Sequence, residues 1–229
     1  MITPSRPTQA AVFVSLVMMA GSGVFLASQY PVLSDILPVH FMANGYPNGW
    51  QFKTYARVLM PLLVQLALAV TFGAVAALLL SRPHGQHDRE AADVRAAKTA
   101  AEAVTLIALI WIAFQAYAAI ALVTMWHRQR AGLGALYYGL EVTGVVASVL
   151  VFARANLQFG RPEPRPFVAA HWRFGHLYKN PDDPALFVPT RDGSRWTLNF
   201  GRPVAAALLG IVLLVGVVGP AAILGFLLR

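Results

Sequence analysis

The chain has 229 residues, of which 57% are hydrophobic and only 12% are charged. With a mean hydropathy of +0.58, it is too apolar for an ordinary soluble domain, and lipid is its expected solvent. The formal charge of +8 does not indicate a nucleic-acid partner, because the lysines and arginines lie between the apolar stretches, where membrane topology alone would place them. Cysteine is absent, which excludes disulfide bonds and thiolate metal sites.

Several apolar stretches are long enough to cross a bilayer as helices. They cover residues 10–30, 55–81, 102–126, 133–153 and 204–228. A secretory signal peptide is the competing interpretation of the first stretch, but the run is long for one and no clear cleavage site follows it. We therefore predict an all-α polytopic membrane protein of about five transmembrane helices, with a small cytoplasmic hairpin-like module before the last helix.

The basic residues predict the orientation, because lysine and arginine near span ends are retained in the cytoplasm. Most of the 18 of them fall inside if the N-terminus is cytoplasmic and the C-terminus lies outside. We therefore expect a multi-pass protein with its N-terminus in the cytoplasm and its C-terminus outside. Its expected segments are an N-terminal domain of two spans and an external loop (1–81), a helical connector with spans three and four (82–155), a cytoplasmic juxtamembrane module (156–203) and a fifth span (204–229). Within the connector, residues 84–98 are expected to extend span three as a solvated helix.

The external loop, residues 31–54, is dense in residues with fixed backbone preferences, so we expect it to be ordered. Trp50 and Phe52 suit the bilayer interface, while Lys53 is expected to face water. One interpretation makes the loop a cap that seats spans one and two. The other makes it a site facing an extracytoplasmic ligand, since histidine offers proton exchange and metal ligation. The candidate ligand-binding residues are His40, Asn44, Trp50 and Lys53. One histidine without neighbouring carboxylates gives no metal site.

In the cytoplasmic segment, Trp196, Leu198 and Phe200 alternate on one face, and a turn at residues 191–194 leads back towards residues 186–188. This pattern predicts a short hairpin. Two strands alone are marginal in water, so we expect the module to pack on the membrane surface, on the helical connector or on a partner, with its basic residues on anionic headgroups. The candidate residues of this module are Asn180, Asp182, Asp183, Trp196 and Asn199. The aspartate pair makes turns or a helix cap, or alternatively binds a divalent cation. No cofactor is expected.

Three polar side chains, Gln65, Gln115 and Glu141, fall near the middle of predicted spans. Polar groups at that depth cost free energy unless they find a partner or serve a function. Glu141 is therefore expected to be protonated or hydrogen-bonded. It either links helices through Gln115, Gln65 or Tyr137, or acts as a proton-carrying group, and the sequence leaves both interpretations open.

Two parts of the chain resemble uncharacterised domains. The external loop resembles the N-terminal domain of SdpI-type membrane proteins, which include an immunity protein against a sporulation-delaying toxin. The residues that carry this resemblance are Pro38, His40, Phe41, Gly45, Pro47, Trp50 and Lys53. The characteristic C-terminal half of the immunity protein is not evident, so toxin immunity is not implied. Residues 180–184, 187–189 and 196–201 resemble a second, juxtamembrane domain that often accompanies the first. Both resemblances imply an architecture rather than a reaction.

These observations predict a non-enzymatic inner-membrane protein. It would sense or bind a ligand through the external loop and present residues 172–202 to a cytoplasmic protein partner. A membrane enzyme using His40, Glu141 or the aspartate pair is the main alternative, but the sequence has no paired zinc ligands, nucleophile elbow or glycine-rich phosphate loop. A small proton-coupled transporter that uses Glu141 is the other alternative.

Overall fold

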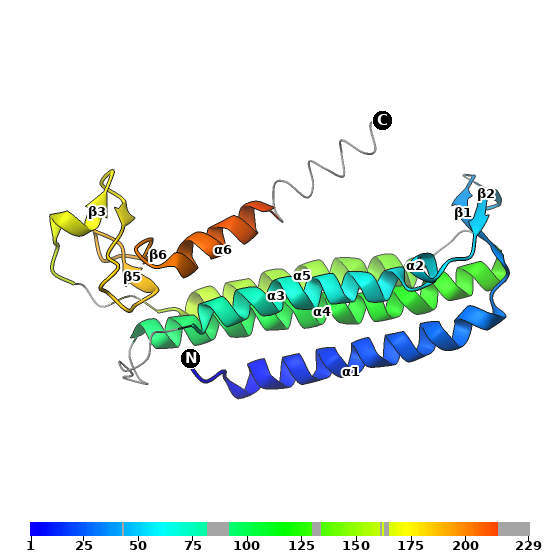
Figure 1. The fold of residues 1–229 in the computed structure, drawn as a ribbon, viewed down its shortest axis with the longest axis horizontal. Coiled ribbons are helices and arrows are strands. Elements are labelled where there is room, and N and C mark those ends of the chain that lie inside the picture. The colour runs from blue at the N-terminus through cyan, green and yellow to red at the C-terminus, as the bar shows by residue number, and fades with distance from the viewer. Residues whose placement is uncertain (43, 82–91, 130–133, 161, 163–164, 215–229) are drawn as a thin grey trace. The chain divides into compact units, whose positions relative to one another are not determined.

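The computed structural model describes residues 1–42, 44–81, 92–129, 134–160, 162 and 165–214 (Figure 1). Within this part, 4 helices are long and apolar enough to cross a membrane. They are α1 (Arg6–Gln29), α3 (Met60–Leu79), α4 (Ala92–Arg128) and α5 (Gly134–Gln158). By helix length and composition, the chain is a multi-pass membrane protein, and the first four predicted spans are confirmed as helices.

The predicted fifth span begins as a helix, α6 (Pro203–Leu213), which is apolar but only 11 residues long. Pro203 occupies the first turn of α6, where its missing N–H has no intrahelical partner to lose. Residues 215–228 of the predicted span lie outside the described residues. The described residues therefore contain four candidate spans, and the full length of the predicted fifth stays a prediction.

The prediction of an all-α chain is wrong in one respect, because short antiparallel hairpins join the helices. They are β1 (Ile36–Phe41) with β2 (Pro47–Phe52), β3 (Trp172–Arg173) with β4 (Leu177–Tyr178), and β5 (Phe187–Pro189) with β6 (Trp196–Leu198). The β5–β6 hairpin was predicted and is confirmed, whereas the other two were not. Three short helices, α2 (Tyr55–Val58), η1 (Tyr30–Val32) and η2 (Ala169–His171), complete the described elements.

The chain divides into two compact units, each with its own core. One unit comprises residues 7–72 and 105–152. Here one side of α1 is buried along a seam of mostly small residues, which allow helices in a membrane to approach closely. The seam consists of Thr8, Ala11, Ser15, Met19, Ser22 and Leu26. A cluster of buried hydrophobic residues packs β1 against α1, α2 and α4. Its buried residues are Leu26, Leu33, Leu37, Val58, Ala119, Val123 and Trp126.

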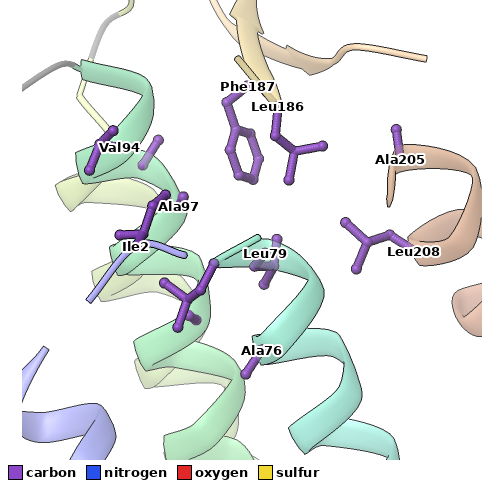
Figure 2. Packing of buried hydrophobic residues seen from close by; sticks show 12 residues of the cluster. Ile2, Ala76, Leu79, Val94, Ala97, Leu186, Phe187, Ala205 and Leu208 are labelled. Carbon is purple, nitrogen blue, oxygen red and sulfur yellow. The ribbon is translucent and has the colours of Figure 1, made fainter. Parts of the chain in front are cut away.

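The other unit comprises residues 1–6, 73–104 and 153–229. Its core joins the end of α3, the start of α4, β5 and α6, and Figure 2 shows Leu186 and Phe187 directed towards the helices. The buried residues include Ile2, Ala76, Leu79, Val94, Ala97, Leu186, Phe187, Ala205 and Leu208. Of the predicted extension over residues 84–98, residues 84–91 lie outside the described residues, and the rest is helical from Ala92 but largely buried, with Arg95 exposed. Val94, Ala96 and Ala97 are buried at 4%, 1% and 2% exposure.

Candidate functional site

The β1–β2 hairpin leads directly from α1 into α2 and α3, so its geometry is set by both helices. Thr54 caps α2, since its hydroxyl accepts a hydrogen bond from the Arg57 backbone N–H at 3.3 Å. The Arg57 guanidinium donates to the Phe52 carbonyl and to the Gln51 side chain. These contacts fasten the end of β2 to the first helical turn that follows it.

Lys53 is the main anchor of the hairpin, and the expectation that it faces water is wrong. Its side chain is only 11% exposed, and its Nζ donates to the Leu33 carbonyl at 2.7 Å. The same Nζ lies 3.3 Å from the Asp35 carboxylate and 5.0 Å from the centre of the Tyr30 ring. Tyr30 in turn stacks on Tyr55, with ring centres 4.1 Å apart. One ammonium group therefore holds the chain before β1 against the end of β2.

The other three candidate residues of this loop remain exposed. His40 Nδ1 lies 2.5 Å from Asn48 Oδ1, a contact that orients the imidazole ring from the facing strand. Asn44 forms a turn in which its Oδ1 accepts from the Tyr46 backbone N–H at 3.1 Å. Trp50 is 52% exposed. The hairpin thus presents polar and aromatic side chains from a fixed backbone.

Gly49 shows why these strands accept only certain residues. It pairs with His40 across the hairpin, and a Cβ at position 49 would lie 2.8 Å from the His40 Cβ. Such a contact is closer than two carbon atoms can approach without a shift of the strand. The glycine therefore permits the close approach that sets the position of His40.

Within the helices, Gln65 is fully buried and joins three elements. Its Nε2 donates to Ser22 Oγ at 3.1 Å and to the Ile112 carbonyl at 2.9 Å, which links α1, α3 and α4. Its Oε1 has no hydrogen-bond partner among the described residues. Intramembrane hydrogen bonds of this kind contribute about 0.6 kcal/mol on average. The contacts support a helix-linking role for Gln65, while Gln115 is only half-buried.

Glu141 differs from the expectation that it joins these polar groups. Its side chain is exposed on α5, and no hydrogen bond connects it to Gln65, Gln115 or Tyr137 in the part of the chain that the structure describes. α5 packs through the side that carries Gly144, where a Cβ would meet Ile110 at 3.6 Å. The predicted depth of Glu141 in the membrane stays a prediction, whereas its expected place on the packed face of α5 is not found.

An exposed carboxyl group predicts a specific response to substitution. Glu141→Leu is expected to favour insertion, because a charged side chain at the centre of a span costs about 2.5 to 3.5 kcal/mol on insertion scales. Glu141→Gln should leave membrane abundance and cellular activity unchanged. Quantitative blotting of membranes together with the deletion phenotype measures both. An abundant but inactive Glu141→Gln chain would instead favour the proton-coupled transporter, since glutamine cannot ionise.

In the unit that contains residues 153–229, residues 165–202 form a compact region, which we call the module from here on. Asn199 lies at its centre and is fully buried. Its Nδ2 donates to the carbonyls of Asn180, Asp183 and Ala185 at 2.8, 3.1 and 3.2 Å. Its Oδ1 accepts from the backbone N–H groups of Asn180 and Gly201 at 3.0 and 2.9 Å. This single side chain therefore joins residues 180–185 to residues 199–201.

The aspartate pair makes turns, as one of the two interpretations predicted. Asp183 Oδ1 accepts from the Ala185 backbone N–H at 2.9 Å, and its Oδ2 accepts from Arg165 at 2.9 Å and from the Tyr178 hydroxyl at 3.1 Å. Burial raises the pKa of Tyr178, and the Asp183 carboxylate adds to that rise. Asp182 is exposed, and its backbone N–H donates to Asn180 Oδ1. Among the described residues, no three His, Asp or Glu side chains gather into a group that could hold a metal ion.

Trp196 joins the module to the end of α5, and Gly201 closes the module on itself. The Trp196 indole donates to the carbonyls of Phe159 and Gly160, which follow the end of α5, at 3.2 and 3.1 Å. Gly201 passes so close to Asn180 that a Cβ would lie 2.3 Å from the Asn180 carbonyl carbon. The candidate residues Asn180, Asp183, Trp196 and Asn199 therefore all make contacts that hold the module together.

The turn between β5 and β6 is stabilised by one carboxylate. Asp192 accepts hydrogen bonds from the Ser194 hydroxyl and backbone N–H and from the Thr190 hydroxyl. These contacts, led by that of the Ser194 side chain, lower the pKa of Asp192 from its ordinary value of 3.8 to about 2. Because the folded pKa is lowered, this stabilisation is present above pH 3.8 and is lost as the pH falls through about 2.

Comparison with known proteins places two recognised domains on this multi-pass membrane protein. The model of a domain of unknown function, DUF1648, matches residues 17–64, which contain the β1–β2 hairpin. The model of a family of unknown function, DUF5808, matches residues 181–205, which contain the β5–β6 hairpin and Asn199. No curated protein and no solved structure matches the chain. The chain thus carries two domains of unknown function at the two positions where the sequence resembled uncharacterised domains.

Proposed function

We propose that this chain is a non-enzymatic bacterial inner-membrane protein that binds an extracytoplasmic ligand through the β1–β2 hairpin and presents the module to a cytoplasmic protein partner. The observation that carries the proposal is that the hairpin has one anchored side chain and three exposed ones. Lys53 is anchored and only 11% exposed at its side chain, whereas His40, Asn44 and Trp50 are exposed on the same short strands and turn. An SdpI-type relationship is part of this proposal.

A fixed backbone favours recognition because little conformational entropy is lost when a ligand binds. The hairpin satisfies this condition through the Lys53 contacts and the buried residues Leu37 and Val58 beneath it. His40 offers a second ring nitrogen for hydrogen bonding, and Trp50 offers a large apolar surface. The ligand class that fits is a polar molecule or peptide with an apolar part.

The exposed residues give the test of ligand binding. His40→Ala and Trp50→Ala are expected to abolish the deletion-rescue phenotype while the chain remains at normal abundance in the membrane. Leu37→Ala serves as the structural control, because Leu37 is 1% exposed and its loss should loosen the hairpin and reduce protease resistance. If His40→Ala and Trp50→Ala rescue the deletion as well as the wild type, the hairpin is a cap rather than a binding site.

The proposed orientation can be tested directly because the natural chain contains no cysteine. Single cysteines at the exposed positions Met42 and Asp182 should label differently with a membrane-impermeant maleimide. We expect residue 42 to react in intact cells and residue 182 to react only after permeabilisation. The opposite pattern at both positions would overturn the orientation with a cytoplasmic N-terminus.

A further inference from the structure

An open cleft lies between the β3–β4 and β5–β6 hairpins of the module, with a volume of about 580 Å³. Three basic side chains line it, together with the Trp172 ring and the Asp192 carboxylate. They are His176, Arg191 and Arg195. The cleft belongs neither to the β1–β2 hairpin nor to the hydrogen bonds around Asn199, so the proposed function leaves it without a role.

The cleft keeps a net positive charge, because two arginines line it beside one carboxylate, Asp192, and within the described part of the chain the Arg191 guanidinium has only the neutral Phe167 ring against it, 4.6 Å from the ring centre. Arg191, Arg195 and His176 form no ion pair with any described carboxylate, whereas Arg165 pairs with Asp183 at 2.9 Å. The one carboxylate at the cleft, Asp192, accepts hydrogen bonds from its own turn instead. Guanidinium groups in a concave site of net positive charge favour an anion, and arginine matches phosphate oxygens with paired N–H donors.

A second, independent feature lies beside the cleft. Phe174 is 90% exposed at the tip of the β3–β4 hairpin, next to Gly175 and His176, which line the cleft. Its φ of 51° is in the left-handed region that a bulky residue rarely adopts. An aromatic ring held out at a hairpin tip gains little in water, but it is suited to the boundary between headgroups and acyl chains.

The position of the module in the chain favours a membrane as the source of the anion. The module begins shortly after α5, a candidate span, and ends where the apolar α6 begins at Pro203. We propose that the cleft binds the phosphate of an anionic phospholipid headgroup and that Phe174 enters the bilayer beside it. Arg191 and Arg195 supply the phosphate contacts, because the Thr190 and Ser194 hydroxyls are already bonded to Asp192.

The natural absence of cysteine allows a nitroxide label to be placed at one position, Phe174→Cys, in the full-length chain. The chain is reconstituted in nanodiscs of phosphatidylcholine alone or mixed with phosphatidylglycerol. We expect the label to be reached by oxygen and shielded from a water-soluble relaxation agent only when the anionic lipid is present. In that lipid, Arg191→Gln or Arg195→Gln should each lower the ratio of inserted to free label roughly fivefold, which is the effect of about 1 kcal/mol per arginine.

Lys179→Gln is the matched control, because Lys179 is exposed, carries the same charge and does not line the cleft. It should change the ratio much less than either arginine variant. A label that stays in water in both lipids, or that inserts equally in all variants, would overturn the proposal. Glycerol phosphate is added to the detergent-solubilised chain as a separate arm. If it binds by calorimetry in an arginine-dependent manner while the label stays in water, the cleft serves a soluble phosphate compound and not the lipid.

The outcome does not depend on the β1–β2 hairpin. His40→Ala should insert the label as the wild type does, so failure of ligand binding at the hairpin and failure of lipid binding at the cleft are separate results. Protease resistance of the arginine variants checks that the module remains folded, which we expect because Arg191 and Arg195 are exposed.

Discussion

Asn199→Ala is expected to unfold the module while the four long helices stay in the membrane. The substitution removes all five side-chain hydrogen bonds of Asn199 and leaves buried backbone groups without partners. We expect a loss of about 4 kcal/mol, because each unsatisfied buried group costs about 1 to 3 kcal/mol and partial relaxation recovers some of it. Two-stranded hairpins are only marginally stable on their own, so a loss of this much stability should unfold them. Limited proteolysis of reconstituted chain should show new cleavage confined to residues 165–202.

Two further variants are compared with Asn199→Ala. Asp182→Ala lies in the same segment but is exposed, so it should resist protease like the wild type. Asn199→Asp keeps the acceptor oxygen but places a second oxygen against three carbonyls, and it should be at least as damaging as alanine. Wild-type protease resistance in Asn199→Ala would show that the two hairpins and the core around Phe187 suffice without this side chain.

Lys53→Met is expected to release the β1–β2 hairpin from the helices beneath it. Methionine keeps much of the aliphatic stem but cannot donate to the Leu33 carbonyl or lie as a cation over the Tyr30 ring. A hydrogen bond from a charged donor contributes about 1.5 to 3 kcal/mol, and a cation over an aromatic ring about 0.5 to 2 kcal/mol. We therefore expect a loss of about 3 kcal/mol, seen as faster amide hydrogen exchange across residues 36–52.

Asp35→Asn is the matched control for the ion pair alone. The Asp35 side chain is 93% exposed, and exposed ion pairs contribute between about 0 and 1 kcal/mol. Hydrogen exchange of the hairpin should therefore hardly change in Asp35→Asn. Equal acceleration in both variants would mean that the carboxylate, rather than the carbonyl and the ring, holds Lys53 in place. The same Lys53→Met chain should also lose the phenotype that depends on His40 and Trp50.

Local patterns predicted one hairpin and missed another for identifiable reasons. β5 and β6 alternate apolar residues around an Asp-Gly turn, which is a strong short-range signal. The β1–β2 hairpin carries the comparable Asn44-Gly45 turn, but its strands contain Pro38 and Pro47, which interrupt the pattern of a regular strand. Proline is tolerated there because both strands of a two-stranded hairpin are edges. Greater weight on the turn than on the prolines would have found these strands.

For the candidate sites, the sequence identified some of the residues but not the partners that they contact. Sequence identified Asn199 and Lys53 as notable residues, but their partners lie up to about 20 positions away and are fixed only by tertiary packing. Both side chains therefore turned out to be anchors rather than exposed contacts. For Glu141, the rise per residue gives depth along α5, whereas the packed face depends on which neighbour α5 meets. The arginines around the cleft were visible only as scattered basic residues before the fold brought them together.

Gly201 has a consequence for how relatives of this protein can be recognised. With a backbone atom of Asn180 only 2.3 Å from where a Cβ would stand, any larger residue forces the chain apart, and Asn199 two positions earlier closes the same junction. The Asn-Phe-Gly ending of the segment is thus a geometric requirement of chain closure. A chain that folds into the same module is therefore expected to need asparagine and glycine at these two positions, whatever it binds.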